Sequence, residues 1–153
     1  MALKEKFRNW GNDELSMKEG IEFTNATTGN MWDEDYTDLL LSHAQFYVFV
    51  EKYDIGALQK VALAKLWHTL STYTLYKQRY NDIITLIRYV FAETAVNMQS
   101  DQNMRSMLMF YVCTEMERLE DQGEIKEMLA EDPDMMGDFM RIFTQKINEK
   151  NVV

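Results

Sequence analysis

The side chains with the greatest potential for catalysis or metal binding are His43, His68 and Cys113, the only histidines and the only cysteine of the chain. A helical zinc site needs two histidines at i, i+4 with an acidic residue nearby, and neither histidine has such neighbours. His43 lies on the apolar face of its predicted helix, where we expect a core histidine that is hydrogen-bonded to a backbone carbonyl. A lone cysteine in an apolar helical stretch is expected in the core. We therefore predict no metal, disulfide or cofactor.

Catalysis by a serine–histidine relay would need the two side chains to meet. Ser42 and His43 are neighbours in sequence, which places them about 100° apart on a helix and prevents a relay between them. The chain also lacks a Gly-x-Ser-x-Gly elbow, a Walker loop and a dinucleotide-binding fingerprint. Because function must be argued from a site, the sequence predicts a protein that is not an enzyme.

Helical periodicity of the apolar residues begins at Asp35 and continues almost to the last residue. One proline and six glycines in 153 residues also favour helices over a fold with many turns. The sequence therefore predicts an all-α single domain of about six helices, roughly over residues 35–53, 55–72, 77–94, 101–121, 125–129 and 133–148. No strand and no internal repeat are predicted.

Single residues set several of the predicted boundaries. Asp54 and Asp132 stand where an N-cap is expected, and Pro133 follows Asp132 as a first helical residue. Gly123 is expected to end the fourth helix. In the first helix the residues expected to face the core are Leu39, His43, Phe46, Val50 and Tyr53. In the last helix they are Met136, Phe139 or Met140, Phe143 and Ile147.

Residues 1–33 differ from the rest and are predicted to form an N-terminal arm. Lys4 to Trp10 could form a short lead-in helix with two aromatic residues on one side. Gly11 to Asn30 holds three of the six glycines and has no periodicity, which favours an extended or mobile segment. The other predicted parts are a helical domain over residues 34–148 and a disordered tail over residues 149–153.

Methionines crowd the last third of the chain, at positions 98, 104, 107, 109, 116, 128, 135, 136 and 140. Most are expected to fill the core, whereas some of Met107, Met109 and Met135 are expected to be exposed. A Met-rich binding groove, or a small-molecule pocket lined by methionine and aromatic side chains, stays open as an alternative.

The formal net charge of −9 argues against direct binding to nucleic acid or to anionic membranes. Ten acids lie between Glu115 and Asp138, and they form either a solvated face or a surface that attracts a basic partner. Met1 to Trp10 shows no secretory signal, and no apolar run reaches the ~20 residues that span a bilayer. An intracellular location, in the cytoplasm or the nucleus, is expected.

Most of the chain resembles the helical region that follows the BTB domain in fungal BTB/POZ-domain proteins. The residues that carry this resemblance are Asp35-Tyr36-Thr37, Leu41-Ser42-His43-Ala44, Tyr47 to Leu58, Leu63 to Leu70 and Leu86 to Phe91. The resemblance implies BACK-like helical hairpins, and the BTB fold itself is absent upstream of Asp35. The chain is therefore expected to be either an excised C-terminal part of such a protein or a stand-alone relative.

The resemblance implies an adaptor or scaffold without catalytic residues. In BTB adaptors the helical pair after the BTB fold extends the cullin-facing groove, so the face formed by Tyr36 to Leu70 could assist such a contact. The expected partner is another protein, such as a cullin or a subunit of a nuclear or chromatin complex, and a homo-oligomer stays open. Because aromatic residues dominate interface hot spots, the residues predicted to bind the partner are Trp32, Tyr36, Trp67, Tyr76 and Tyr80.

Overall fold

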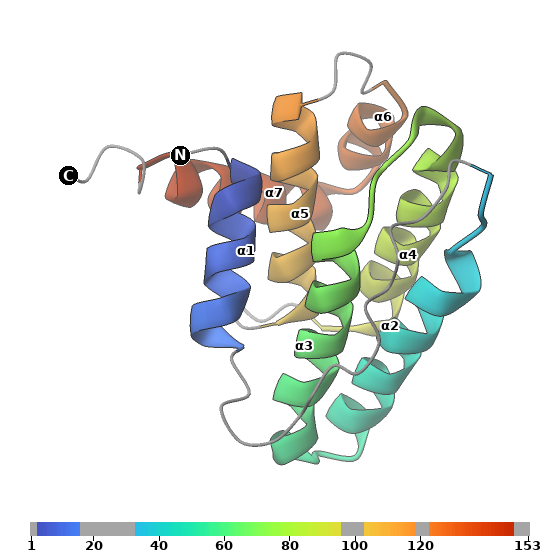
Figure 1. Ribbon diagram of the computed structural model, residues 1–153, viewed down its shortest axis with the longest axis vertical. Coiled ribbons are helices and arrows are strands. Elements are labelled where there is room, and N and C mark those ends of the chain that lie inside the picture. The colour runs from blue at the N-terminus through green and yellow to red at the C-terminus, as the bar shows by residue number, and fades with distance from the viewer. Residues whose placement is uncertain (1–2, 16–32, 96–102, 119–122, 149–153) are drawn as a thin grey trace.

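The computed structural model describes residues 3–15, 33–95, 103–118 and 123–148. These ranges form α-helices joined by short connections, with one 3₁₀ helix and no strand among them (Figure 1), which confirms the all-α prediction. Trp32 and the predicted tail over residues 149–153 lie outside the described residues. The elements are α1 (Leu3–Glu14), α2 (Thr37–Lys52), α3 (Gly56–Thr72), η1 (Lys77–Arg79), α4 (Tyr80–Glu93), α5 (Met104–Arg118), α6 (Gly123–Glu131) and α7 (Pro133–Asn148).

Helix α5 is the centre of the fold. Every residue from 104 to 115 is buried, because α1, α3, α4 and α7 pack around this helix (Figure 1). A helix that is enclosed on all sides needs no polar stripe. The expectation that some of Met107, Met109 and Met135 are exposed is therefore wrong, since all three are buried. These methionines fill the core rather than line a groove.

Helices α2 and α3 form the predicted hairpin and pack side by side (Figure 1), with α4 against α2. The buried residues of α2 are Leu40, Ala44, Tyr47 and Val50. Val50 was predicted correctly, and each of the other three lies one residue after the residue that was predicted to face the core. A shift of one residue turns a helix face by about 100°. The helix has apolar residues on both stripes, so its periodicity fits two orientations and only packing against α3 and α4 selects one.

The turn between α2 and α3 differs from the prediction at Asp54. This residue has a positive φ of 53°, and its N–H donates to the Glu51 carbonyl at 3.2 Å while the Ile55 N–H donates to the Val50 carbonyl at 3.0 Å. The two bonds form a Schellman motif, which satisfies the last carbonyls of α2. Asp54 therefore ends α2 in the position that glycine usually takes, and it does not cap α3, whose preceding residue is Ile55.

Helix α1 packs onto the core through Leu3, Phe7 and Leu15. It continues to Glu14, so the predicted end at Trp10 is wrong. Gly11 was expected to begin the extended or mobile segment. Here it lies against Trp67, where a Cβ atom would come within 1.8 Å of the indole Cε2. The glycine is thus a close-packing position, and residues 3–15 share the core of the helices that follow.

Helix α7 begins as predicted at Asp132 and Pro133. The Asp132 Oδ1 atom accepts hydrogen bonds from the backbone N–H groups of Asp134 at 3.0 Å and Met135 at 3.2 Å. Phe139 rather than Met140 faces the core, and Met140 is 50% exposed. Gly123, in contrast, begins α6 instead of ending the preceding helix.

Replacing Asp132 with alanine is expected to lower the free energy of unfolding by about 1 kcal/mol, because two N–H groups of the first turn lose their acceptor. In a domain of this size the melting temperature should fall by about 2–4 °C. Thermal unfolding followed by circular dichroism measures the change. The control is Asp134→Ala, which removes a neighbouring acid that accepts no cap bond and should cost less; equal losses would contradict the capping role.

Candidate protein interaction surface

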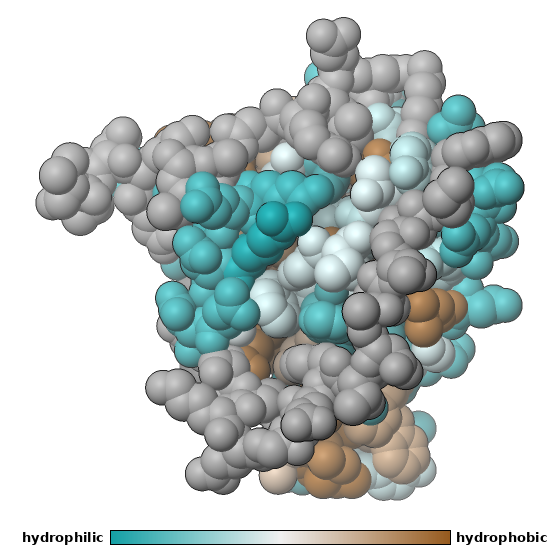
Figure 2. All heavy atoms as spheres, in the orientation of Figure 1, coloured by the Kyte–Doolittle hydropathy of each residue, from teal (hydrophilic) through white to brown (hydrophobic). Residues whose placement is uncertain are grey.

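A group of apolar side chains stays exposed on the α2–α3 hairpin. Phe49 and Tyr53 are 53% and 61% exposed, Leu39 is 41% exposed, and Ile55 and Leu58 are each 37% exposed. Figure 2 shows hydrophobic residues gathered at the end of the molecule where this hairpin turns. Exposed apolar side chains are ordinary when isolated and informative when they are contiguous.

Two of these side chains contact each other, and a neighbouring aromatic residue contacts a lysine of α3. The rings of Phe49 and Tyr53 lie with their centroids 4.7 Å apart. One turn earlier, the half-buried Phe46 ring lies under the Lys65 ammonium of α3, which is 5.3 Å from the ring centroid. We call the set Leu39, Phe46, Phe49, Tyr53, Ile55 and Leu58 the hairpin surface. Its members on α2 follow helical spacing, so they form a stripe beside the buried one.

Lysines accompany the hairpin surface. Lys52 is exposed three residues after Phe49, and Lys65 is exposed beside Phe46. On α2, Glu51 is half-buried on the side of the buried Tyr47, whose pKa is raised by burial and next by the Glu51 charge. Lys52 and Lys65 therefore border the part of the surface around Phe46 and Phe49, whereas the exposed Asp38 and Asp54 lie at its two ends, next to Leu39 and Tyr53.

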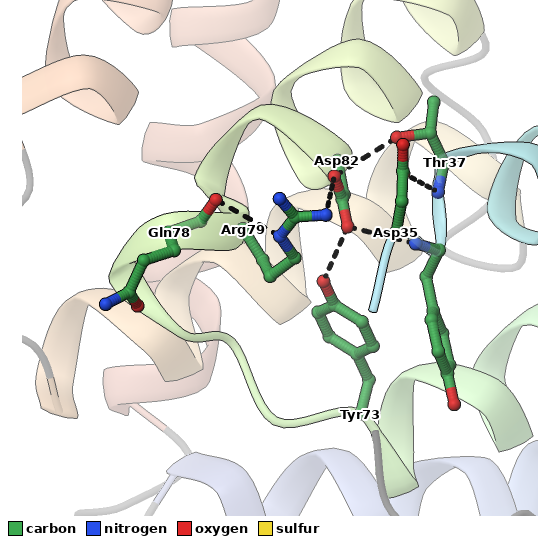
Figure 3. Close-up of polar contacts among 7 residues, drawn as sticks. Asp35, Thr37, Tyr73, Gln78, Arg79 and Asp82 are labelled. Carbon is green, nitrogen blue, oxygen red and sulfur yellow. Dashed lines mark hydrogen bonds and ion pairs between the residues drawn. The ribbon is translucent and has the colours of Figure 1, made fainter. Parts of the chain in front are cut away.

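The start of α2 is fixed by one buried carboxylate, that of Asp82 in the first turn of α4. Asp82 is 3% exposed and accepts hydrogen bonds from the Tyr36 N–H at 3.2 Å, the Thr37 hydroxyl at 3.1 Å and the Tyr73 hydroxyl at 3.3 Å. Arg79 Nη1 lies 4.0 Å from the same carboxylate. Figure 3 shows these groups converging on Asp82 from three segments. A carboxylate with three donors and almost no exposure positions helices and is closed to a substrate.

Asp35 and Tyr73 lie beside Asp82 and belong to the same network (Figure 3). The Asp35 Oδ1 atom accepts the Thr37 N–H at 2.9 Å, and hydrogen bonds from Thr37 lower the pKa of the exposed Asp35 carboxyl. Burial, and next the Asp82 charge, raise the pKa of Tyr73. The phenol thus keeps its proton and donates it to Asp82. The network ties the first turn of α2 to α4 and to the connection after α3.

The structure places His43 beside a hydroxyl of α3 and Cys113 in the core. His43 Nε2 lies 3.2 Å from the Thr69 hydroxyl, so its partner is a side chain and not the predicted backbone carbonyl. Burial, and next the Lys65 charge, lower the pKa of His43. Cys113 is buried, and burial raises its pKa to about 12. Within the described ranges no cluster of three metal-binding side chains is present, and no helix is long and apolar enough to cross a membrane.

Two of the predicted partner-binding aromatics are buried in the structure. Trp67 is buried, and its indole N–H donates to the Phe7 carbonyl at 3.1 Å. Tyr80 is also buried. These two side chains pack inside the molecule, so neither offers an open surface in this conformation.

The other predicted aromatics are half-buried or lie outside the described residues. The Tyr36 ring centroid lies 5.5 Å from that of Tyr73, at the edge of the core. Tyr76 is half-buried in the connection before η1. Trp32 falls in a part of the chain that the structure does not describe. Partner binding by these residues stays a prediction.

Sequence reasoning missed the exposure of the hairpin surface. Two of its six members, Leu39 and Tyr53, were expected to face the core but are exposed. Phe46, which was expected there too, is half-buried and packs against the core. The signal was present in α2, which has too many apolar residues for a single buried stripe. The leftover stripe marks a surface that no other element of the described chain covers.

The acidic segment between Glu115 and Asp138 is only partly available to a partner. Glu115 is buried, and Asp132 caps α7. Glu131 pairs with Arg88 at 3.0 Å, and Asp138 pairs with Arg141 at 3.7 Å. These internal uses weaken the interpretation of the whole segment as one acidic docking face.

Comparisons of the chain with protein-family models, with curated proteins and with solved structures find no match. Since an α-helical fold is compatible with many activities, the function is inferred from the surface chemistry of the chain itself.

Proposed function

We propose that this chain is a non-enzymatic protein interaction module, an adaptor or scaffold whose hairpin surface binds an acidic amphipathic helix of another protein. The observation that carries the proposal is the set of exposed apolar side chains on the α2–α3 hairpin, in which Phe49 and Tyr53 contact each other and are more than half exposed. Large exposed aromatic side chains supply much of the affinity in protein interfaces. Leaving them in water is a cost that a partner would remove.

The shape of the surface suggests a helical partner. From Leu39 to Tyr53 the stripe runs almost the length of α2, about 21 Å at 1.5 Å per residue. A partner helix of about four turns could lie along it with apolar residues at i, i+3, i+4 and i+7. Lys52 and Lys65 would meet acidic residues that flank those anchors, which favours an acidic helix over a basic one.

The resemblance to the post-BTB helical region supports the adaptor role, because the hairpin surface lies inside Tyr36 to Leu70. A cullin or a nuclear complex subunit is accordingly the candidate partner class, in the cytoplasm or the nucleus. The alternative of an acidic docking face has less support, since four of its acids serve internal contacts. A contact that used those acids would require a basic partner helix, which makes the two proposals separable.

Binding of a synthetic peptide tests the proposal. The peptide is an amphipathic helix with leucines on one face and glutamates elsewhere, titrated into the isotope-labelled chain and followed by NMR. We expect the shift changes to gather on the hairpin surface and the binding to weaken as salt rises. A peptide with lysines in place of the glutamates should bind at least about 10-fold more weakly.

The double variant Phe49→Ser, Tyr53→Ser should reduce peptide affinity by about 30-fold or more, the cost of losing a hot spot. Because both side chains are exposed, its melting temperature should stay close to that of the parent. Met140→Ser is the matched control, since it removes an exposed apolar side chain from α7. Shift changes elsewhere, or equal affinities for the double variant and the control, would refute the proposed surface.

A further inference from the structure

A cavity of about 480 Å³ lies between α1 and the end of α3, a volume in the range of small-molecule sites. It is not lined by methionine, so it differs from the pocket considered in the sequence. The described residues that line it are Lys4, Arg8, Asn12, Trp67, Ser71, Thr72, Tyr73 and Thr74. Figure 2 shows this face, with the hydrophilic side of α1 next to the paler residues of α3.

The α1 wall of the cavity is positively charged and donates hydrogen bonds. Lys4, Arg8 and Asn12 follow at i, i+4 and i+8, so one face of α1 presents an ammonium, a guanidinium and an amide to the cavity. None of the described lining residues is acidic, in a chain whose net charge is −9. This wall therefore suits an anionic group.

The α3 wall offers acceptors. The Ser71 hydroxyl donates to the Trp67 carbonyl at 2.8 Å, and the Thr72 hydroxyl donates to the Thr69 carbonyl at 3.2 Å. The Ser71 hydroxyl has one hydrogen, so with that hydrogen engaged the Ser71 oxygen can only accept from a ligand. A ligand that bridges the cavity would need acceptors or negative charge toward α1 and hydroxyl donors toward α3.

One opposing effect is the negative end of the α3 dipole, near Ser71 and Thr72. A helix terminus has about half an elementary charge, whereas Arg8 alone contributes one full positive charge. The guanidinium outweighs the dipole, and the cavity favours an anion.

We propose that this cavity binds a small hydroxylated organic phosphate of the sugar-phosphate class. Arg8 holds the phosphate through its planar guanidinium, which suits phosphate oxygens. The Ser71 oxygen accepts a hydrogen bond from a sugar hydroxyl. The site is separate from the hairpin surface and does not depend on it.

Calorimetric titration of the whole chain with three probes tests this inference: glucose phosphate, glucose and inorganic phosphate. Glucose phosphate should bind most tightly, inorganic phosphate at least about 10-fold more weakly, and glucose should show no binding. Equal affinity for the two phosphates would refute a role for the α3 wall, and equal affinity for glucose would refute the anion site.

Variants locate the site. Arg8→Gln should weaken glucose phosphate at least about 10-fold, and Ser71→Ala should weaken it about 2- to 10-fold, the range of one neutral hydrogen bond. Lys126→Gln, which removes an exposed cation on α6, is the control and should bind like the parent. Arg8 is exposed, so its variant should melt with the parent. The same weakening in Lys126→Gln, or none in Arg8→Gln, would overturn the proposal.

Discussion

Replacing Asp82 with alanine is expected to lower the free energy of unfolding by about 3 kcal/mol. The substitution leaves the Tyr36 N–H and the Thr37 and Tyr73 hydroxyls without their shared acceptor. A buried donor that loses its partner costs about 1–3 kcal/mol, and three donors depend on this carboxylate. The loss should be the largest of any single acidic residue in α2 to α4.

Urea unfolding measures this loss, and hydrogen exchange locates it. Exchange should quicken most in the first turn of α2, which the network attaches to α4. Asp38→Ala is the matched control, because it removes an exposed acid from the same turn and should cost less than about 1 kcal/mol. If Asp82→Ala cost no more than Asp38→Ala, the network would not be what fixes α2.

Replacing Gly11 with alanine is expected to lower the free energy of unfolding by about 2–3 kcal/mol. The added Cβ would lie 1.8 Å from the Trp67 indole, so either the ring or α1 must move, and overpacking of this kind costs about 1–3 kcal/mol. Replacing a glycine inside a helix with alanine ordinarily raises the free energy of unfolding by about 0.5–1 kcal/mol. The expected loss is therefore opposite in sign to the helix-propensity effect.

Gly137→Ala supplies the matched control. Gly137 lies inside α7 with nothing within 4 Å of an added Cβ. The free energy of unfolding of this variant should therefore rise by about 0.5–1 kcal/mol. Thermal unfolding gives both changes, and the NMR signal of the Trp67 indole N–H reports the bond to the Phe7 carbonyl. Two glycine variants that shift stability in the same direction would contradict the close packing of α1 on Trp67.

Local signals predicted the helices well but not which side of each one is buried. Asp132 and Pro133 correctly mark the start of α7, because a cap acts within one turn. Asp54, Gly11 and Gly123 have equally plausible local interpretations, yet each was assigned the wrong role. Whether a glycine breaks a helix or admits a neighbour depends on what packs against it, and for Gly11 that neighbour is Trp67, far away in sequence.

Long-range contacts account for the rest. The Asp82 network joins residues 46 positions apart, and no spacing rule predicts that an acid in α4 receives the N–H of Tyr36. Arg105 is similar: its guanidinium is buried, donates to the Phe91 carbonyl at 3.0 Å and lies 4.6 Å from the Phe91 ring. Arg105 thus provides a hydrogen-bond donor to the C-terminal end of α4, where a cation is favoured. Arg105 itself belongs to the next helix, α5.

The candidate surface shows the same limit. Aromatic type alone suggested Trp67 and Tyr80, which the fold buries. The better criterion is an apolar stripe left over once the core-facing stripe is assigned, and that assignment requires knowing how α2 packs. Once the core-facing stripe of α2 is known, this criterion selects Phe49 and Tyr53 as exposed residues.

The central claim is that the hairpin surface contacts a partner protein, and site-specific photocrosslinking in native extract tests it most directly. A photoreactive residue replaces Gln45, which is exposed one turn before Phe49, or Thr144, which is exposed on α7. The account predicts a defined cross-linked species from position 45 that the acidic peptide competes away. That species should be absent from position 144 and lost in the Phe49→Ser, Tyr53→Ser variant. The same species from both positions, or one that survives the double substitution, would contradict it.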